Sequence, residues 1–358
     1  MGSKISRFEN IQVLRGIAVM MVVLFHIHAL ESQYFHAITL MPDFFDVGTA
    51  GVDIFFVVSG FIMIEVTRGK FQQPVEIFRF IYNRIARIYP IYWFYSLLLL
   101  LVFFIHPAWI NHLQADHHLS MVRSFLLIPQ ETLPLLTVSW TLIHEMYFYV
   151  VMTGLLLLPE KFLLQLLGLW ALFVMVSHFL GTAHSATLLL MTHPLTIEFI
   201  AGCLIAKFHA QGKKLSAWCV FVLGIITFLG VGYAHFLPSD VRGGWPRIIL
   251  FGTPSVLLVY GGVLLEHHKI LISTLLRKLG NASYSIYLSH LFVLSVLGRM
   301  YAVVVISNPI VHMAALILEL IVVMVVGWLS FHYLENPLTY YFSHKIKKTQ
   351  LVLANSAL

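Results

Sequence analysis

The sequence predicts an all-α, polytopic integral membrane protein with about ten transmembrane helices. Of the 358 residues, 59% are hydrophobic and only 11% are charged, and the mean hydropathy is +0.87. Soluble domains carry about 25% charged residues, so this composition excludes a water-soluble fold. The apolar residues form runs of about 20, the length that a helix needs to cross ~30 Å of hydrocarbon. The run SLLLLLVFF at 96–104 lacks the alternation of a barrel strand, which excludes a membrane barrel.

Ten segments are long and apolar enough to be transmembrane helices. In chain order they are 11–30, 48–66, 88–106, 136–158, 162–180, 192–209, 215–236, 247–265, 282–302 and 311–334. An even number of spans places both termini on one side of the membrane. Of the 22 Lys and Arg residues, 17 fall on that side and 4 on the other, with Arg15 inside a span. The positive-inside rule therefore predicts that both termini are cytoplasmic.

The first span resembles a secretory signal peptide only in its start, which follows Lys4 and Arg7. It is longer than a signal peptide, Arg15 and His26 interrupt it, and no small-residue cleavage site follows. We therefore expect a helix that is retained in the protein.

Several functional classes lack support in the sequence. The net charge of +6 comes from short loops between spans, so membrane orientation explains it better than nucleic-acid binding. The two cysteines, Cys203 and Cys219, lie in or beside apolar segments and offer neither a disulfide framework nor a metal spacing. The adjacent histidine pairs at 117–118 and 267–268 diverge on any regular element, so we expect no metal site. No Walker loop, dinucleotide fingerprint or GxSxG motif occurs.

Arg15 and His26 are the first candidate functional residues. A charged side chain at the centre of the bilayer costs at least ~2.5 kcal/mol, so such residues face protein or water. Eleven residues advance a helix by about three turns, which puts both side chains on one face, roughly 16 Å apart along the axis. One groove could hold both. Alternatively, Arg15 snorkels to the cytoplasmic surface and His26 ends the helix on the far side.

Two carboxylates also lie within predicted spans. Asp53 belongs to the segment GVDIFFVVSG, and it could be functional or could form a structural ion pair with Arg15 or Arg84. Glu145 follows His144 in the fourth span. The two side chains point about 100° apart on a helix, so at most one of them faces a given cavity squarely.

Arg84 and Arg87 are spaced i and i+3 at the cytoplasmic end of the third span. Two guanidinium groups on one face suit the binding of phosphates. The alternative is that they only anchor the helix at the cytoplasmic surface.

Polar side chains also cluster near the ninth and tenth spans. Ser283, Tyr287 and His290 form a stripe at i, i+4 and i+7, which could line a site or make hydrogen bonds between helices. His332 and Glu335 end the last span just before a proline, and helix termination with contact to lipid headgroups explains them adequately.

Taken together, these residues resemble the acyltransferase family 3 proteins, membrane enzymes of bacteria and eukaryotes that O-acylate sugars and other acceptors. The matching motifs occur in order along nearly the whole chain: 10–18 with Arg15 and His26 in R-x10-H spacing, 51–61, 84–93 with R-x-x-R, 139–145, 199–202, 279–290 and 332–337. The chain departs from the pattern at Gln12, where an acidic residue is common, and at Ser289, where an apolar residue is frequent.

The resemblance implies acetyl-CoA as the acyl donor, approaching from the cytoplasm, and an acceptor handled at or beyond the membrane. It implies that Arg15 and His26 are essential and that Arg84 and Arg87 contact the CoA end. We assign Tyr89, Ser139 and Trp140 to the donor site as well. As substrate-binding or structural polar residues we assign Asp53, Ser59, Tyr284, Tyr287 and His290.

His26 is the candidate general base in this hypothesis. An imidazole with an ordinary pKa of ~6.5 can accept a hydroxyl proton at neutral pH. Glu145 or another buried carboxylate would fix its tautomer, and a cation or hydroxyl would stabilise the oxyanion. Arg15, nearer the cytoplasm, would contact the CoA arm or a buried carboxylate. A covalent acetyl-histidine intermediate stays open.

The expected organisation is one acyltransferase domain at 1–340 and a short, basic, cytoplasmic tail at 341–358. Some relatives carry a fused extracytoplasmic SGNH hydrolase-like domain, which we do not expect here, so the membrane domain would transfer the acyl group directly. The expected acceptor is an envelope polysaccharide or glycolipid, such as lipopolysaccharide O-antigen, at the bacterial inner membrane. The alternative is a transporter or flippase of a lipid-linked saccharide, because ten spans with intramembrane charges also fit a polar pathway.

Overall fold

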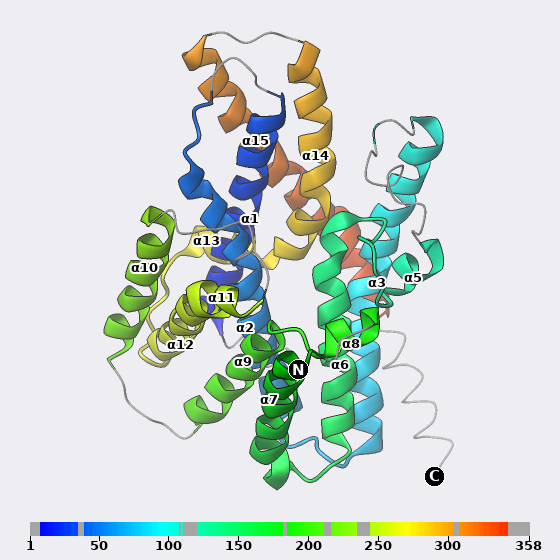
Figure 1. The fold of residues 1–358 in the computed structure, drawn as a ribbon, viewed down its shortest axis with the longest axis vertical. Helices are drawn as coiled ribbons and strands as arrows, with labels where there is room; N and C mark the ends of the chain where they lie inside the picture. Colours follow the sequence, from blue (N-terminus) through cyan, green and yellow to red (C-terminus); the bar gives the residue numbers. More distant parts are fainter. Residues whose placement is uncertain are drawn as a thin grey trace.

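The computed structural model describes residues 8–34, 39–106, 109, 120–181, 185–210, 216–234, 244–303 and 308–342 (Figure 1). Helices joined by turns and loops account for these residues, and no strand occurs among them, which confirms the all-α class. Residues 343–358, which hold most of the predicted tail, lie outside the described residues.

The helices follow one another along the chain with short 3-10 and π segments between them. The first half contains α1 (Glu9–Tyr34), η2 (Asp43–Ala50), α2 (Gly51–Thr67), α3 (Pro74–Ile105), α5 (Met121–Leu126), η4 (Thr137–Ser139), α6 (Trp140–Leu156), η5 (Glu160–Phe162) and α7 (Leu163–Leu180). The second half contains α8 (Ala186–Met191), α9 (Thr196–Ala210), α10 (Ala217–Tyr233), α11 (Trp245–Arg247), η7 (Ile248–Gly252), α12 (Thr253–His267), α13 (Thr274–Asn281), α14 (Ser283–Val303), α15 (Pro309–Ser330) and η8 (Phe331–Glu335).

Seven helical stretches within the described residues are long and apolar enough to cross a membrane. They are 9–34, 43–67, 74–105, 160–180, 186–208, 245–267 and 309–342. Each of the ten predicted spans overlaps a helix, but α6 and α10 have only 17 residues each. The chain is therefore a polytopic helical membrane protein, while the count of ten spans and the side of the termini stay predictions.

The third helix begins well before the predicted start of its span, at Pro74 rather than at 88. Its first turns carry Glu76 and Arg79, which pair with each other, and Lys70 lies 3.3 Å from the same glutamate. Hydropathy locates only the apolar part of a helix, so the charged turns that precede it escape a search for apolar runs.

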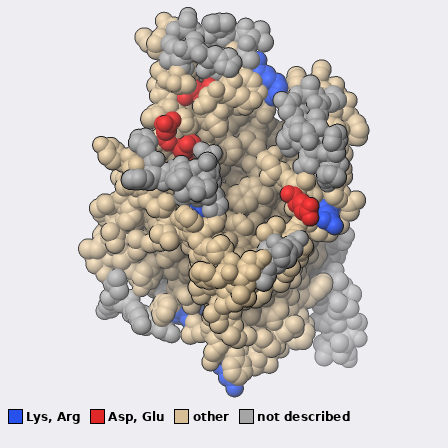
Figure 2. Space-filling view, in the orientation of Figure 1, with Lys and Arg blue, Asp and Glu red and all other residues tan. Residues whose placement is uncertain are grey.

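The outer surface of the bundle is apolar. Leu97, Leu101 and Phe104 on α3 expose between 55% and 73% of their surface. Most of the face shown in Figure 2 carries neither Lys and Arg nor Asp and Glu. A surface of this composition suits contact with lipid chains.

Helices α2 and α9 pack with their backbones in direct contact. A Cβ atom on Gly60 would lie 1.9 Å from the carbonyl oxygen of Phe199, and one on Gly202 would lie 2.0 Å from that of Val57. Small residues that face each other in this way let membrane helices approach closely. This contact holds α2, which carries Ser59 and Asp53, at a fixed distance from α9.

We expect the change Gly60→Ala to destabilise the protein by at least ~1–3 kcal/mol, because the added methyl group forces two backbones apart. Thermal unfolding in detergent measures the effect as a lower Tm. The matched control is Gly168→Ala on α7, where an added Cβ meets nothing within 4 Å. Alanine there stabilises a helix by ~0.5–1 kcal/mol. An unchanged Tm for Gly60→Ala contradicts the close packing.

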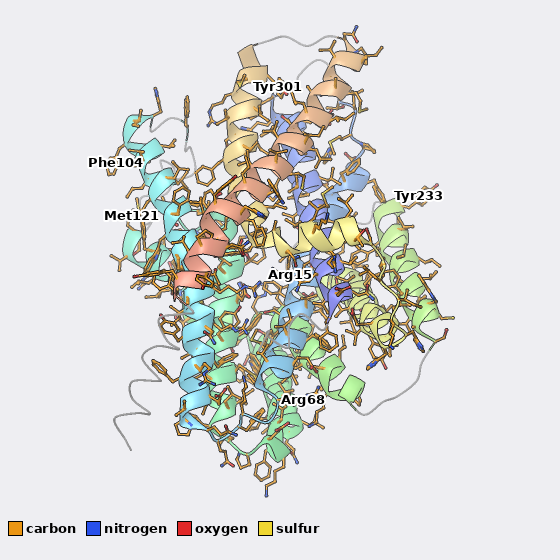
Figure 3. The ribbon with its side chains drawn as sticks, turned by 180° about the vertical axis from the view of Figure 1, so that it is seen from behind. Arg15, Arg68, Phe104, Met121, Tyr233 and Tyr301 are labelled. Carbon is orange, nitrogen blue, oxygen red and sulfur yellow. The ribbon has the colours of Figure 1, made fainter. Side chains whose placement is uncertain are left out.

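Helix α13 lies across α1 near the middle of the bundle (Figure 3). A Cβ atom on Gly16 would lie 2.2 Å from the carbonyl oxygen of Leu276, and one on Gly280 would lie 1.7 Å from that of Gln12. The two backbones therefore touch with no side chain between them. This crossing fixes the backbone of α1 at the residue that follows Arg15.

Candidate active site

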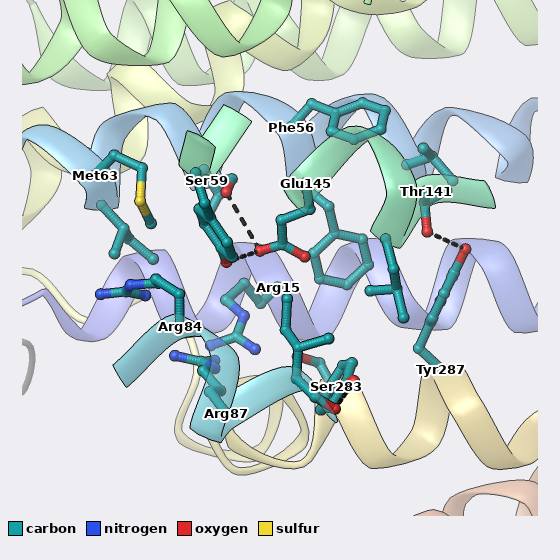
Figure 4. A pocket seen from close by; sticks show the side chains of 18 residues that line it. Arg15, Phe56, Ser59, Met63, Arg84, Arg87, Thr141, Glu145, Ser283 and Tyr287 are labelled. Atoms are coloured by element: carbon teal, nitrogen blue, oxygen red, sulfur yellow. Dashed lines mark hydrogen bonds between the residues drawn. The ribbon is translucent and has the colours of Figure 1, made fainter. Parts of the chain in front are cut away.

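A cavity of about 810 Å³, measured to its open mouth, lies between α1, α2, α3, α6 and α14 (Figure 4). Its apolar walls come mainly from α2. Its polar lining consists of Arg15, Ser59, Arg84, Arg87, Thr141, Glu145, Tyr149, Ser283, Tyr284 and Tyr287. Residues from five separate sequence motifs thus meet in one space, including seven of the thirteen predicted site residues.

Three guanidinium groups gather at one end of this cavity (Figure 4). Arg15 is 8% exposed and donates a hydrogen bond to Gln12 Oε1 at 3.0 Å, while Arg84 is 7% exposed and lies over the rings of Phe80 and Tyr149. Among the described residues, none of these three arginines has a carboxylate oxygen within 4.0 Å. This end of the cavity is therefore positively charged and suited to binding an anion.

Glu145 lies in the same cavity but is bound to neutral partners. Its Oε1 accepts hydrogen bonds from the hydroxyl groups of Tyr149 and, at 3.5 Å, Ser59. His144, the preceding residue, points elsewhere: its Nδ1 donates to the Trp140 carbonyl oxygen at 3.0 Å, and its ring contacts His193. Only one of the two neighbours lines the cavity, as helix geometry predicts.

His26 does not line this cavity. Its Nδ1 lies 2.9 Å from the Val22 carbonyl oxygen, which can only accept, so Nδ1 carries the proton and Nε2 has a free lone pair. A backbone carbonyl therefore fixes the tautomer, in place of the expected Glu145 or another buried carboxylate. The ring of His26 contacts the ring of His290, with centroids 4.8 Å apart.

Tyr287 and His290 connect the cavity to His26. Tyr287 lines the cavity, its hydroxyl is 2.9 Å from Thr141 Oγ1, and its ring centroid is 5.7 Å from that of His290. His290 in turn contacts His26. The predicted polar stripe on α14 thus leads from the arginine-lined cavity to the candidate base.

Asp53 forms an ion pair outside the cavity, but with neither of the two expected partners. Its carboxylate accepts hydrogen bonds from Arg247 Nε at 3.0 Å and Nη2 at 2.5 Å, and both side chains are almost completely buried. Arg247 also donates to the Thr49 carbonyl oxygen. The expected pairing with Arg15 or Arg84 is wrong, because α11 brings a cation from 194 residues away.

Three residues assigned to the donor site lie apart from the arginines. The hydroxyl of Tyr89 donates to the Leu126 carbonyl oxygen at 2.8 Å. Ser139 is completely buried before α6, and Trp140 packs edge-on against His144. The structure does not bring these three residues into the cavity.

Glu335 is a functional candidate that the sequence interpretation missed. It is 7% exposed at the end of the π segment η8, accepts a hydrogen bond from Ser285 Oγ at 2.6 Å, and interacts electrostatically with Arg15 and Arg87. Helix termination seemed to explain it. The available signal was a glutamate at the end of an apolar span. The structure adds that it lies in a π segment, and such segments often occur at functional sites.

The chain is similar to known acyltransferase sequences. The profile described as an acyltransferase domain matches residues 8–333. The chain is 32% identical over 321 residues to the exopolysaccharide production protein ExoZ of Rhizobium meliloti, covering 85% of this chain and 93% of that protein. It is 23% identical over 380 residues to the peptidoglycan O-acetyltransferase OatA of Listeria monocytogenes, covering 92% of this chain but only 55% of that protein. No solved structure gives a significant match.

Proposed function

The chain belongs to acyltransferase family 3, whose domain matches its residues 8–333, and on this premise we propose that it transfers acetyl from acetyl-CoA to a hydroxyl group of an envelope glycan. The observation that carries the proposal is the cluster of Arg15, Arg84 and Arg87 at one end of a single cavity, where no carboxylate oxygen of the described residues lies within 4.0 Å of them. Guanidinium groups bind phosphates through charge-assisted hydrogen bonds, and the donor carries its phosphates at the end opposite the thioester.

The positions of Arg15 and His26 on α1 support an orientation in which the phosphates of the donor lie at the arginines and its thioester lies toward His26. The two residues are separated by about three turns, or roughly 16 Å along the helix axis. A donor held by its phosphates at the arginines extends its arm along α1 and Tyr287 toward His26. Because 17 of the 22 basic residues fall on the side of the termini, we assign the arginine end to the cytoplasm.

His26 acts as general base in the proposed reaction. Its Nε2 takes the proton of the acceptor hydroxyl while the oxygen attacks the thioester carbon. The carbon–sulfur bond then breaks, and the leaving thiolate takes the proton from Nε2, which returns His26 to its neutral form. A hydroxyl group on the Tyr287 side of the cavity stabilises the oxyanion.

The two relatives support a saccharide acceptor. One is named for exopolysaccharide production and the other for O-acetylation of peptidoglycan. We propose an envelope polysaccharide or glycolipid, with lipopolysaccharide O-antigen as the first substrate to test, and a location in the bacterial inner membrane. One domain at 1–340 with a cytoplasmic tail at 341–358 completes the proposal.

Purified protein in lipid nanodiscs tests this function. With acetyl-CoA and glycans extracted from cells that lack the protein, we expect release of free CoA thiol and a mass increase of one acetyl group on the glycan. Mass spectrometry of envelope glycans from cells with and without the protein identifies the acceptor. Movement of a lipid-linked saccharide across the bilayer without any acetyl transfer would instead favour a flippase.

We expect Arg84→Ala and Arg87→Ala each to raise the KM for acetyl-CoA roughly tenfold or more, because each removes charge-assisted hydrogen bonds of about 1.5–3 kcal/mol. The KM for S-acetylpantetheine, which lacks phosphates, stays unchanged. The matched control is Arg79→Ala on the same helix, whose guanidinium pairs with Glu76 outside the cavity. An equal rise in KM for both donors argues against a phosphate site at these arginines.

A further inference from the structure

His290 contains a buried nitrogen that lacks a hydrogen-bond partner. The side chain is completely buried, and its Nδ1 lies 2.6 Å from the Tyr287 carbonyl oxygen, so Nδ1 carries the proton. Its Nε2 is therefore an acceptor, and no donor reaches it among the described residues. Leaving a buried acceptor unpaired costs free energy, so such an atom calls for an explanation.

The nearest ring to His290 is that of His26, on the facing helix α1. The two centroids are 4.8 Å apart, and the ring planes are inclined by 64°. Since Nδ1 of His290 is held against its own helix, the opposite edge of the ring is turned away from α14. His26 is held in the same way at the Val22 carbonyl oxygen. In the resting state both rings offer a lone pair at Nε2, and two lone pairs cannot form a hydrogen bond.

Proton uptake by His26 changes this arrangement. When Nε2 of His26 accepts the proton of the acceptor hydroxyl, it becomes an N–H donor, and a donor is what Nε2 of His290 lacks. We propose that His290 is a positioning residue that accepts a hydrogen bond from the His26 imidazolium and holds it between the two proton transfers. The proton then leaves Nε2 of His26 for the thiolate, so both rings end neutral. This inference rests on the proposed role of His26 as base.

A second pair of histidines provides a matched contrast. His144 is also buried, its Nδ1 donates to its own helix, and its Nε2 is unpartnered among the described residues. It contacts His193 with centroids 4.9 Å apart. However, Nδ1 of His193 accepts from the Leu195 N–H, so Nε2 of His193 already carries a proton in the neutral ring. This pair does not depend on proton uptake, and neither ring lines the cavity.

The test compares His290→Phe and His290→Gln with His144→Phe and His144→Gln, using acetyl-CoA and extracted envelope glycans. Phenylalanine keeps the ring but has no acceptor, so we expect His290→Phe to lower kcat roughly tenfold or more. The KM for acetyl-CoA stays unchanged. Glutamine offers a carbonyl acceptor and recovers part of the lost turnover. Both His144 variants keep the wild-type kcat.

Thermal unfolding supplies the readout that a purely structural role would not give. Because His290→Phe removes an unsatisfied buried atom, we expect its Tm to equal or exceed that of the wild type while its kcat falls. Wild-type kcat in folded His290→Phe overturns the inference, as does a Tm that falls in step with kcat or an equal loss in the His144 variants. If His26→Gln is inactive in the same assay, only the inference on His290 falls. Full activity of His26→Gln contradicts the role of His26 as the base, and the inference on His290 then falls as well.

Discussion

Changing His26 to glutamine lowers acetyl transfer by roughly 10²–10⁴-fold, the range that a general base contributes to catalysis. Glutamine keeps an amide that can donate to the Val22 carbonyl oxygen, so the side chain stays in place, but it cannot accept the hydroxyl proton. The KM for acetyl-CoA stays close to that of the wild type, because the arginine cavity is untouched. Release of free CoA thiol and acetylation of the glycan, measured on equal amounts of folded protein, check the result.

The control for this prediction lies on the same helix, two residues further along. His28 is buried, and its Nε2 lies 3.8 Å from Asp43 and 3.9 Å from Asp46, away from the cavity and from His290. We expect His28→Gln to keep the wild-type turnover. Full acetylation by folded His26→Gln protein would exclude His26 as the base and leave a different group to take the proton.

Changing Arg247 to methionine destabilises the protein by about 3–5 kcal/mol, because it leaves the carboxylate of Asp53 buried without its partner. The side chain of Asp53 is fully buried, and that of Arg247 is 4% exposed. Glu198, 1% exposed, interacts electrostatically with both and adds a second acid to the same space. Thermal unfolding in detergent and the yield of folded protein measure the loss.

The double change Arg247→Met and Asp53→Leu separates a lost charge partner from a packing defect. Replacing both members of a buried ion pair with apolar side chains is often neutral or stabilising. We therefore expect the double variant to be more stable than Arg247→Met alone. The single variant Asp53→Leu completes the comparison. If the loss of stability in the double variant equals the sum of the losses in the two single variants, the charges of the pair make no net contribution to stability.

The sequence predicted the class of fold and the clustering of motif residues better than it predicted partners. Apolar runs locate membrane helices because the bilayer requires about 20 apolar residues, and each predicted span overlaps a helix. The spacing of Arg84 and Arg87 places both on one helix face, and both line the cavity. Both predictions succeed because they depend only on local geometry: the length of an apolar run and the spacing of residues on one helix.

The same local geometry accounts for two residues that were assigned to the donor site but lie outside the cavity. Tyr89 lies two residues beyond Arg87, about 200° further around the helix, so it points away from the cavity. Trp140 lies five residues before Glu145, about 140° away. We assigned these residues to the donor site because they are close in sequence to Arg87 and Glu145. On a helix, however, the side chains of close neighbours point in different directions.

Contacts between distant helices lay beyond local reasoning. The partner of Asp53 depends on which of several buried cations the packing brings near, and α11 supplies Arg247 from a distant part of the chain. The link through Tyr287 and His290 depends on how α14 meets α1. Pairings of this kind are set by the packing of whole helices, which periodicity in one sequence does not specify.

The backbone contact between Gly16 and Gly280 decides which parts of the donor site an engineer can remodel. Since α1 and α13 touch without intervening side chains, no substitution at this crossing can shift Arg15 without disturbing both helices. The wall contributed by α2 is different, because apolar residues such as Ile62 and Met63 line the cavity there and belong to no backbone crossing of this kind. A library that seeks acceptance of bulkier thioesters should therefore vary the α2 wall and keep the crossing at Gly16 and Gly280 constant.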